Sequence, residues 1–182
     1  MTDRQGQPFV VRGYEPDDRV ALERMYEDFE PKRSAQGLPP ENGIARWLDN
    51  VLARGQHLVV DVAGEVLGHL MLMPTPDGED TLELANFLHQ SIRNRGIGTH
   101  LNRIALLLAR DAGAKRVAQR GAVQLRGGAL GSEVGFRRRP ASLWAHEIEL
   151  EEWLTTSETS NSHVSKGRTA CASRDTRQTL KP

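Results

Sequence analysis

The sequence predicts a single mixed α/β domain followed by a tail that adds nothing to its core. A chain of 182 residues is long enough to bury a core without disulfides or a structural metal. Between residues 9 and 150, short apolar runs typical of strands are interspersed with segments whose apolar residues recur at helical spacing. Beyond Leu154 the apolar residues nearly disappear.

The tail is expected to be disordered. Of the 28 residues from 155 to 182, 11 are Ser or Thr, and the only large aliphatic residues are Val164 and Leu180. So little apolar surface cannot offset the entropy that ordering would cost. We therefore place the domain at residues 1–154 and a disordered Ser/Thr/Arg-rich tail at residues 155–182.

Composition argues against several classes of function. The chain has 24 basic and 24 acidic residues, so it lacks the basic excess of a nucleic-acid-binding protein. Its longest apolar run, residues 104–109, is far too short to span a membrane, and its first residues contain no apolar signal core. The lone Cys171 can form neither an internal disulfide nor a thiol-rich zinc site. We expect a cytoplasmic protein that binds neither nucleic acid nor membranes.

The first half of the domain is predicted to contain one strand and two helices. Residues 9–12 form the strand, and Pro16 with the acidic residues beside it is typical of a helix start. The apolar residues that share one face of this helix are Leu22, Met25, Tyr26 and Phe29. After a Pro- and Gly-rich loop, residues 44–52 form a second amphipathic helix, which Gly55 ends.

The second half is predicted to be rich in strands. Residues 57–63 and 66–73 form a hairpin with a tight turn at Gly64 and Glu65. A third strand covers residues 81–88. The elements expected after it are a helix over 97–112 ended by Gly113, a strand over 115–123, a short helix over 125–134, a strand from Phe136 and a strand over 144–150.

The turn between residues 88 and 97 carries the clearest chemical signal. Free backbone amides at a helix N-terminus bind phosphate oxygens, and Gly96 and Gly98 would let a phosphate approach closely. Arg93 and Arg95 add positive charge. The residues alone leave two interpretations open: a phosphate or pyrophosphate site, or a tight strand-to-helix connection. A nucleotide-hydrolysing P-loop is excluded because Gly-Lys-Ser/Thr is absent, and a dinucleotide fingerprint because Leu101 stands at its third Gly.

This segment resembles the GNAT superfamily of acetyl-CoA-dependent N-acyltransferases. Their signature is Arg or Gln, two residues, Gly, one residue, and Gly or Ala, which Arg93, Gly96 and Gly98 match. The predicted order of elements is that of the family, and Gly135 with Phe136 is similar to its Gly-Phe pair. The resemblance covers residues 9–154 and implies a mostly antiparallel twisted sheet with helices on both faces.

The resemblance also implies acetyl-CoA as the co-substrate. Family members bind its pyrophosphate with the turn amides and its pantetheine arm with backbone groups at the end of their fourth strand, which here is the predicted strand over 81–88. At that point the fourth and fifth strands splay into a V-shaped opening. The implied cofactor-binding residues are Phe87, Leu88, His89, Arg93, Asn94, Arg95, Gly96, Ile97, Gly98 and Thr99.

One residue is a candidate general base. Acyl transfer to an amine requires a group that removes the amine's proton. Glu83, facing opposite to Leu82 and Leu84, resembles the strand-four glutamate that serves as this base in some members, often through water. The alternative is an ordinary exposed glutamate. Gly131 departs from the family pattern, because many members carry at this position a Tyr that protonates the leaving thiolate. The neighbouring Ser132 also has a hydroxyl group, but a serine here is more typical of a helix cap than of a general acid.

The remaining candidate residues have ordinary structural interpretations. No metal site is expected, because no pair of histidines has metal-ligand spacing. His69 and His146 could face the acceptor pocket or be ordinary hydrogen-bonded histidines. The arginine run 137–139 could attract the 3′-phosphate of the cofactor or line a solvated strand edge, and we favour the edge.

The predicted function is N-acetyl transfer from acetyl-CoA to a primary amine by direct attack, with a small-molecule or peptide amine as acceptor. Gly131 keeps one alternative open, a catalytically silent acyl-CoA-binding module of the same fold. A second alternative is an interaction protein that acts through its tail. The sequence identifies neither the acceptor nor the oligomeric state, for which a homodimer stays open.

Overall fold

The computed structural model describes residues 1–31, 39–75, 78–119, 137–138 and 146–151, which form strands and helices in the predicted order. Up to Leu150 they belong to one compact unit. The strands are β1 (Val10–Gly13), β2 (Gln56–Val62), β3 (Glu65–Thr75), β4 (Gly78–Leu88), β5 (Arg116–Gln119), β6 (Arg137–Arg138) and β7 (His146–Glu149). The helices are α1 (Arg19–Glu27), α2 (Ile44–Leu52) and α3 (Ile97–Asp111), with the 3-10 turns η1 (Pro16–Asp18) and η2 (Gln90–Ile92).

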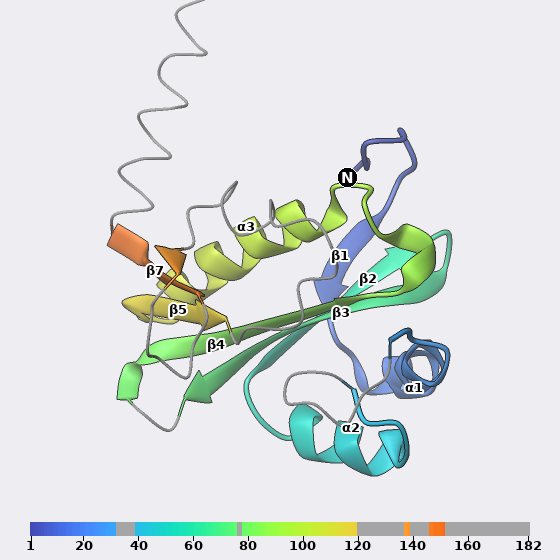
Figure 1. The fold of residues 1–182 in the computed structure, drawn as a ribbon, viewed down its shortest axis with the longest axis horizontal. Helices are drawn as coiled ribbons and strands as arrows, with labels where there is room; N and C mark the ends of the chain where they lie inside the picture. Colours follow the sequence, from blue (N-terminus) through green and yellow to red (C-terminus); the bar gives the residue numbers. More distant parts are fainter. Residues whose placement is uncertain (32–38, 76–77, 120–136, 139–145, 152–182) are drawn as a thin grey trace, which may run out of the picture. The chain divides into compact units, whose positions relative to one another are not determined.

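The strands form one open, mixed sheet in the order β1-β2-β3-β4-β5-β7-β6. Neighbouring strands are antiparallel except β4 and β5, which run parallel because α3 crosses over between them. Figure 1 shows α3 on one side of the sheet and α1 and α2 on the other. The predicted fold class is confirmed. The first two arginines of the run 137–139 form β6, which is the last strand in this order. They therefore lie at an edge of the sheet, the location that the sequence analysis favoured.

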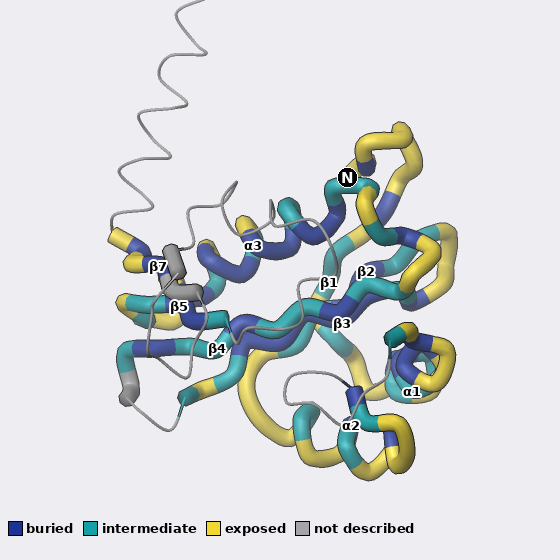
Figure 2. The backbone as a smooth tube through the Cα atoms, in the orientation of Figure 1, coloured by how far each residue is buried: buried dark blue, intermediate teal, exposed yellow. Residues whose placement is uncertain are grey.

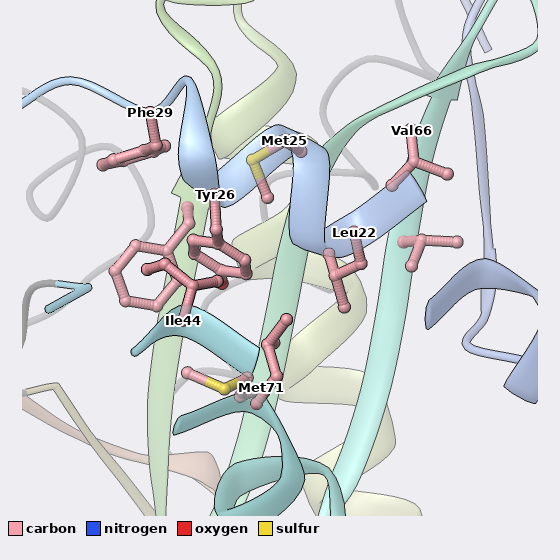
Figure 3. Packing of buried hydrophobic residues seen from close by; sticks show 10 residues of the cluster. Leu22, Met25, Tyr26, Phe29, Ile44, Val66 and Met71 are labelled. Atoms are coloured by element: carbon pink, nitrogen blue, oxygen red, sulfur yellow. The ribbon is translucent and has the colours of Figure 1, made fainter. Parts of the chain in front are cut away.

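The apolar layer between the sheet and the α1–α2 pair includes aromatic residues, among them Tyr26 and Phe29 (Figure 3). Its buried members are Leu22, Met25, Tyr26, Phe29, Ile44, Leu48, Val59, Val66, Met71 and Phe87. The four α1-face residues expected from helical spacing are all among them. Each large side chain buried in this way contributes roughly 1.5–3 kcal/mol of transfer free energy.

The opposite face of the sheet is covered by α3. Figure 2 shows buried and less buried stretches alternating along this helix, as expected for one that packs with a single face. Leu101, Ala105 and Leu106 are completely buried. The Asn86 side chain on β4 donates a hydrogen bond of 2.6 Å to Asn102 on α3, and this bond ties the helix to the strand that precedes it.

The hairpin turn between β2 and β3 lies one residue earlier than predicted. Its two residues are Ala63 and Gly64, not Gly64 and Glu65, and both have positive φ, 56° and 85°. The Asp61 carboxylate accepts the Gly64 N–H at 2.8 Å and so stabilises a left-handed turn that an alanine rarely adopts. The sequence analysis placed the turn at Gly64 and Glu65 from the residue types alone, and it could not predict the hydrogen bond from Asp61.

Several predicted features lie outside the described residues. They are the end of the strand over 115–123, the helix over 125–134, Gly131, Ser132, Phe136, Arg139 and the tail over 155–182. The domain boundary at Leu154 therefore stays a prediction. Within the described ranges, no helix is both long and apolar enough to traverse a lipid bilayer.

Candidate functional site

The parallel pairing of β4 and β5 is short. It joins Thr81 to Arg116, Leu82 to Val117 and Glu83 to Ala118, whereas β4 continues to Leu88. Beyond Glu83, β4 therefore has β3 on one side and no described strand on the other. We call this stretch, which is unpaired on one side among the described residues, the open edge; it is where the resemblance implies the V-shaped opening.

Backbone alternation determines which groups of β4 face the open edge. The His89 N–H donates to the Leu67 carbonyl on β3, at 2.9 Å. Because consecutive strand residues direct their N–H and C=O groups to opposite sides, Phe87 also faces β3, whereas Leu84, Asn86 and Leu88 face the open edge. Of the three residues predicted from β4, only Leu88 directs its backbone to the edge. The sequence alone could not predict which residues of β4 direct their backbone groups to the edge, because this depends on how β4 pairs with β3.

Glu83 lies in the last residue pair before the strands separate, opposite Met73 on β3 and Ala118 on β5. Its side chain is half-buried. It shares its face of β4 with Ala85 and Phe87, which pack against the α1–α2 layer. Asn86, on the other face, points to α3, so the predicted orientation of Glu83 opposite to Leu82 and Leu84 agrees with the structure.

The turn before α3 has the backbone geometry of an anion site. Asn94 and Gly96 have positive φ, 61° and 83°, and Gly96 is the N-cap of α3. The positive φ favours glycine at position 96, and an ideal Cβ there would lie 3.0 Å from a side-chain carbon of Arg4, which would have to move slightly. Within the described part of the chain, the N–H groups of Ile97 and Gly98 have no acceptor. These amides, at the positive end of the helix dipole, can bind phosphate oxygens.

The Arg93 guanidinium is held near the end of β4. Its Nε donates to the Leu88 carbonyl at 2.8 Å, and its Cζ lies 4.7 Å from the centre of the Phe29 ring. Burial lowers the pKa of this guanidinium from its usual value. Its Nη2 is buried and has no hydrogen-bond partner among the described residues. A buried donor of this kind needs an acceptor, which a water or a ligand oxygen can supply.

Arg95 is paired with a residue from the far end of the sequence. Its Nε donates to the carboxylate of Asp3, whose side chain is completely buried. Burial by itself raises the pKa of the Asp3 carboxyl, but hydrogen bonds from the Gln7 and Gln5 N–H groups and from Arg95 lower it on balance. The backbone of the turn is held as well, because the Arg4 N–H donates to the Arg95 carbonyl at 2.9 Å. This N-terminal support was missed by sequence reasoning.

The end of α1 is fastened to the segment that follows β4. The Gln90 side chain donates to the Asp28 carbonyl at 2.6 Å and accepts the Glu30 N–H at 3.0 Å. His89 Nε2 lies 3.0 Å from the Asp28 carboxylate, and its Nδ1 lies 2.8 Å from the Ser91 hydroxyl. The side chain of His89 thus links α1 to η2. These bonds fix the start of the loop between α1 and α2 relative to the turn.

His69 is part of a buried hydrogen-bonded chain and does not face an open pocket. Tyr26 Oη lies 2.8 Å from His69 Nδ1, His69 Nε2 lies 3.1 Å from His57 Nδ1, and His57 Nε2 lies 2.7 Å from the Arg54 carbonyl. Since a carbonyl only accepts, neutral His57 must carry its proton on Nε2. His69 then donates from Nε2 to His57, and the Tyr26 hydroxyl donates to His69. Every member has a partner, as expected for an ordinary core histidine.

The buried chain predicts an acid-sensitive fold. Burial, followed by the nearby His57, lowers the pKa of His69 to about 3, whereas an unfolded histidine has a pKa of about 6.5. Between these values the unfolded chain binds a proton that the folded chain does not, so falling pH favours unfolding. We expect the free energy of unfolding to be about 2 kcal/mol lower at pH 5 than at pH 7 because of this residue.

Denaturant titrations of the wild-type chain and of His69→Gln at both pH values measure this effect. The variant loses stability at pH 7, because Tyr26 and His57 lose their partner, but we expect its pH dependence to be smaller by about the stated 2 kcal/mol. An identical pH dependence would contradict the assignment. An NMR titration gives a second measurement, since a His69 ring that protonates between pH 7 and 5 would also contradict it.

The described residues contain no group of three or more His, Cys, Asp or Glu side chains that could hold a metal ion. Of the predicted cofactor residues, the structure brings Asn94 to Thr99 together in the turn, and Leu88 and Arg93 at its junction with β4. The Phe87 side chain belongs to the core.

Comparison with known proteins places the same residues in a family context. The sequence model of the acetyltransferase (GNAT) family matches residues 21–126, which run from α1 past β5 and include Glu83 and the turn. No curated protein sequence is a significant match to the chain.

Solved structures share the fold at low sequence identity. The GNAT domain of S. lividans PAT is 18% identical, with a TM-score of 0.69 over 82% of this chain and 94% of that chain. A GNAT family acetyltransferase from Brucella melitensis in complex with acetyl-CoA is 20% identical, with a TM-score of 0.60 over 79% and 88%. The spermidine/spermine N-acetyltransferase of Vibrio cholerae is 14% identical, with a TM-score of 0.61 over 82% and 98%.

Proposed function

Because the chain belongs to the acetyltransferase (GNAT) family, we propose that it is an N-acetyltransferase, which transfers the acetyl group of acetyl-CoA to a primary amine. The observation that carries this proposal is the open edge of β4, which runs from Glu83 at one end to the amide-lined turn at the other. The two ends are the places needed for the reacting acetyl group and for the phosphates. The proposal agrees with the acetyl-CoA complex of the Brucella neighbour and with the amine that the Vibrio neighbour's name gives as its substrate.

The residues present fit acetyl-CoA. The Ile97 and Gly98 N–H groups would bind the pyrophosphate, and Gly96 offers no side chain that would block it. From Leu84 to Leu88, β4 rises roughly 13 Å, and its outward backbone groups would pair with the amides of an extended pantetheine arm. The buried Nη2 of Arg93 would donate to a carbonyl of the same arm.

The chemistry requires a proton acceptor and a polarised carbonyl. In the reaction, the amine nitrogen bonds to the thioester carbonyl carbon, the carbon–sulfur bond breaks, and CoA is released. Glu83, at the point where β4 and β5 separate, takes the proton that the amine loses, directly or through water. N–H groups at the open edge stabilise the charge that develops on the carbonyl oxygen. Because both reactants would be held along one strand, orientation supplies a further part of the rate enhancement.

The proposal is tested by calorimetry with acetyl-CoA and by a turnover screen over a panel of small-molecule amines and peptides, with release of free CoA as the readout. We expect binding of acetyl-CoA and CoA release that depends on at least one primary amine. A chain that does not bind acetyl-CoA would contradict the proposal.

A second candidate function is a catalytically silent acyl-CoA-binding module. It is favoured by Gly131, where the resemblance implies a phenolic acid in many members. The same two measurements separate the candidates. Binding of acetyl-CoA without amine-dependent CoA release from any member of the panel would favour the silent module.

A further inference from the structure

We propose that Gln90, in the η2 turn between β4 and α3, is a positioning residue for the amine acceptor: its side chain holds Phe29 against the face of β4 along which an extended amine reaches Glu83. In this role Gln90 contacts neither reactant and acts through Phe29. The inference rests on the proposed function, but it concerns the side of the site that binds the amine and not the binding of acetyl-CoA.

The Gln90 side chain binds the backbone on both sides of Phe29. Its Nε2 donates to the Asp28 carbonyl at 2.6 Å, and its Oε1 accepts the Glu30 N–H at 3.0 Å. The N–H groups of Asp28 and Phe29 bind carbonyls of α1, so Glu30 is the first residue after the helix whose N–H bonds outside it. His89 adds a second link to this segment, but its partner is the exposed carboxylate of Asp28 and not the backbone. The path of the chain as it leaves α1 therefore depends on Gln90.

Phe29 lies on the face of β4 that carries Glu83. The Glu83, Ala85 and Phe87 side chains share this face, because alternate residues of a strand point to the same side. The Phe29 ring packs edge-on against the Phe87 ring, with the ring centres 5.8 Å apart and the planes at 76°. Four residues separate Glu83 from Phe87, which corresponds to roughly 13 Å along the strand. Phe29 therefore bounds this face at the end nearest the turn, where an amine that extends from Glu83 along the strand meets it.

The acetyl-CoA site has its own supports. The Arg93 guanidinium lies over the Phe29 ring, but its Nε also donates to the Leu88 carbonyl, a bond that does not involve Gln90. The turn before α3 is fastened from the other direction, by the ion pair between Arg95 and Asp3. A change confined to the Gln90 side chain should therefore disturb the binding of the amine and leave the affinity for acetyl-CoA unchanged.

The test compares two primary amines of different length, ethylamine and tetra-alanine amide, in the CoA-release assay at saturating acetyl-CoA. An extended tetrapeptide spans roughly 13 Å, enough to reach from Glu83 to Phe29, whereas ethylamine is far too short. The variant is Gln90→Met, which keeps the length of the side chain but removes both hydrogen bonds. We expect the KM for tetra-alanine amide to rise about five- to tenfold, while kcat, the KM for ethylamine and the Kd for acetyl-CoA stay within about twofold of the wild type.

The matched control is Gln56→Met, which should leave all four constants unchanged. Gln56 is exposed at the start of β2 and pairs with Leu72, which in turn pairs with Leu84, so it lies on the other face of the sheet from Glu83.

Amide hydrogen exchange gives a second readout, which does not depend on turnover. The Glu30 N–H should exchange faster in Gln90→Met than in the wild type, because its acceptor is gone. The His89 N–H, which binds the Leu67 carbonyl within the sheet, is the reference and should exchange at the same rate in both. Equal Glu30 rates would show that Gln90 does not hold this segment. Faster exchange at His89 as well would show that the substitution disturbs the sheet, and the positioning role would be abandoned.

The kinetic results separate this inference from the function on which it rests. An unchanged KM for tetra-alanine amide, or an equal rise for both amines, would refute the positioning role. A loss of acetyl-CoA affinity in Gln90→Met would assign Gln90 to the cofactor site instead. Wild-type CoA release with other amines of the panel but not with tetra-alanine amide would show that this face accepts no extended amine, and would refute the inference alone. If no amine gives CoA release with the wild-type chain, the proposed function fails and this inference fails with it.

Discussion

Replacement of Glu83 by glutamine is expected to lower kcat by roughly 10²- to 10⁴-fold near neutral pH, because the amide cannot accept the proton that the attacking amine loses. Glu83 lies in the last β4–β5 pair, at the start of the open edge, so its loss should affect the chemical step and not the binding of the nucleotide at the distant turn. The affinity for acetyl-CoA, measured by calorimetry, is expected to stay within about twofold of the wild type.

The matched control is Glu65→Gln, which makes the same chemical change at an exposed position at the start of β3. It should leave kcat unchanged. A Glu83→Gln variant with wild-type kcat would return Glu83 to the role of an ordinary strand glutamate. A fall in acetyl-CoA affinity that parallels the fall in rate would instead show that the substitution disturbs the sheet.

Sequence patterns predicted the fold well where the physical signal is local. The apolar spacing on α1 and α3, the start of α3 at Ile97 and the strand over 81–88, which the structure extends back to Gly78, all depend on residues close together in the chain. The parallel pairing of β4 with β5 follows from the crossover helix between them. The resemblance to the family then added the opening beside β4, which neither propensity nor periodicity predicts.

The contacts that refine the site connect residues far apart in the sequence. Asp3 pairs with Arg95, Gln90 binds Asp28, and His69 joins Tyr26 to His57. No local pattern marks these partners, because each side chain taken alone is an ordinary polar residue. The sequence predicted that Arg93 and Arg95 add positive charge at the turn, but it could not predict the protein partners that the structure shows for both.

Replacement of Gly98 by aspartate is expected to weaken acetyl-CoA binding about thirtyfold or more. Gly98 is in the first turn of α3, and its N–H has no acceptor among the described residues. An aspartate here would place its carboxylate near the amides that the phosphates require, and two like charges about 4 Å apart repel by roughly 1 kcal/mol in water and 4 kcal/mol at a partly shielded surface. An intermediate loss of about 2 kcal/mol corresponds to the stated thirtyfold.

Gly98 is buried in the first turn of α3, so the melting temperature of the variant is measured beside its affinity, although an acidic residue in this turn is itself favourable toward the helix dipole. The isosteric control is Gly98→Asn, which adds the same volume without the charge, so the ratio of the two dissociation constants isolates the electrostatic part. This ratio should decrease as salt is raised, since ions screen the repulsion. Equal losses in the two variants would mean that the side chain acts through its volume alone. A Gly98→Asp variant that keeps both its melting temperature and its wild-type affinity would show that the phosphates bind elsewhere, because no phosphate can share these amides with a carboxylate at no cost in affinity.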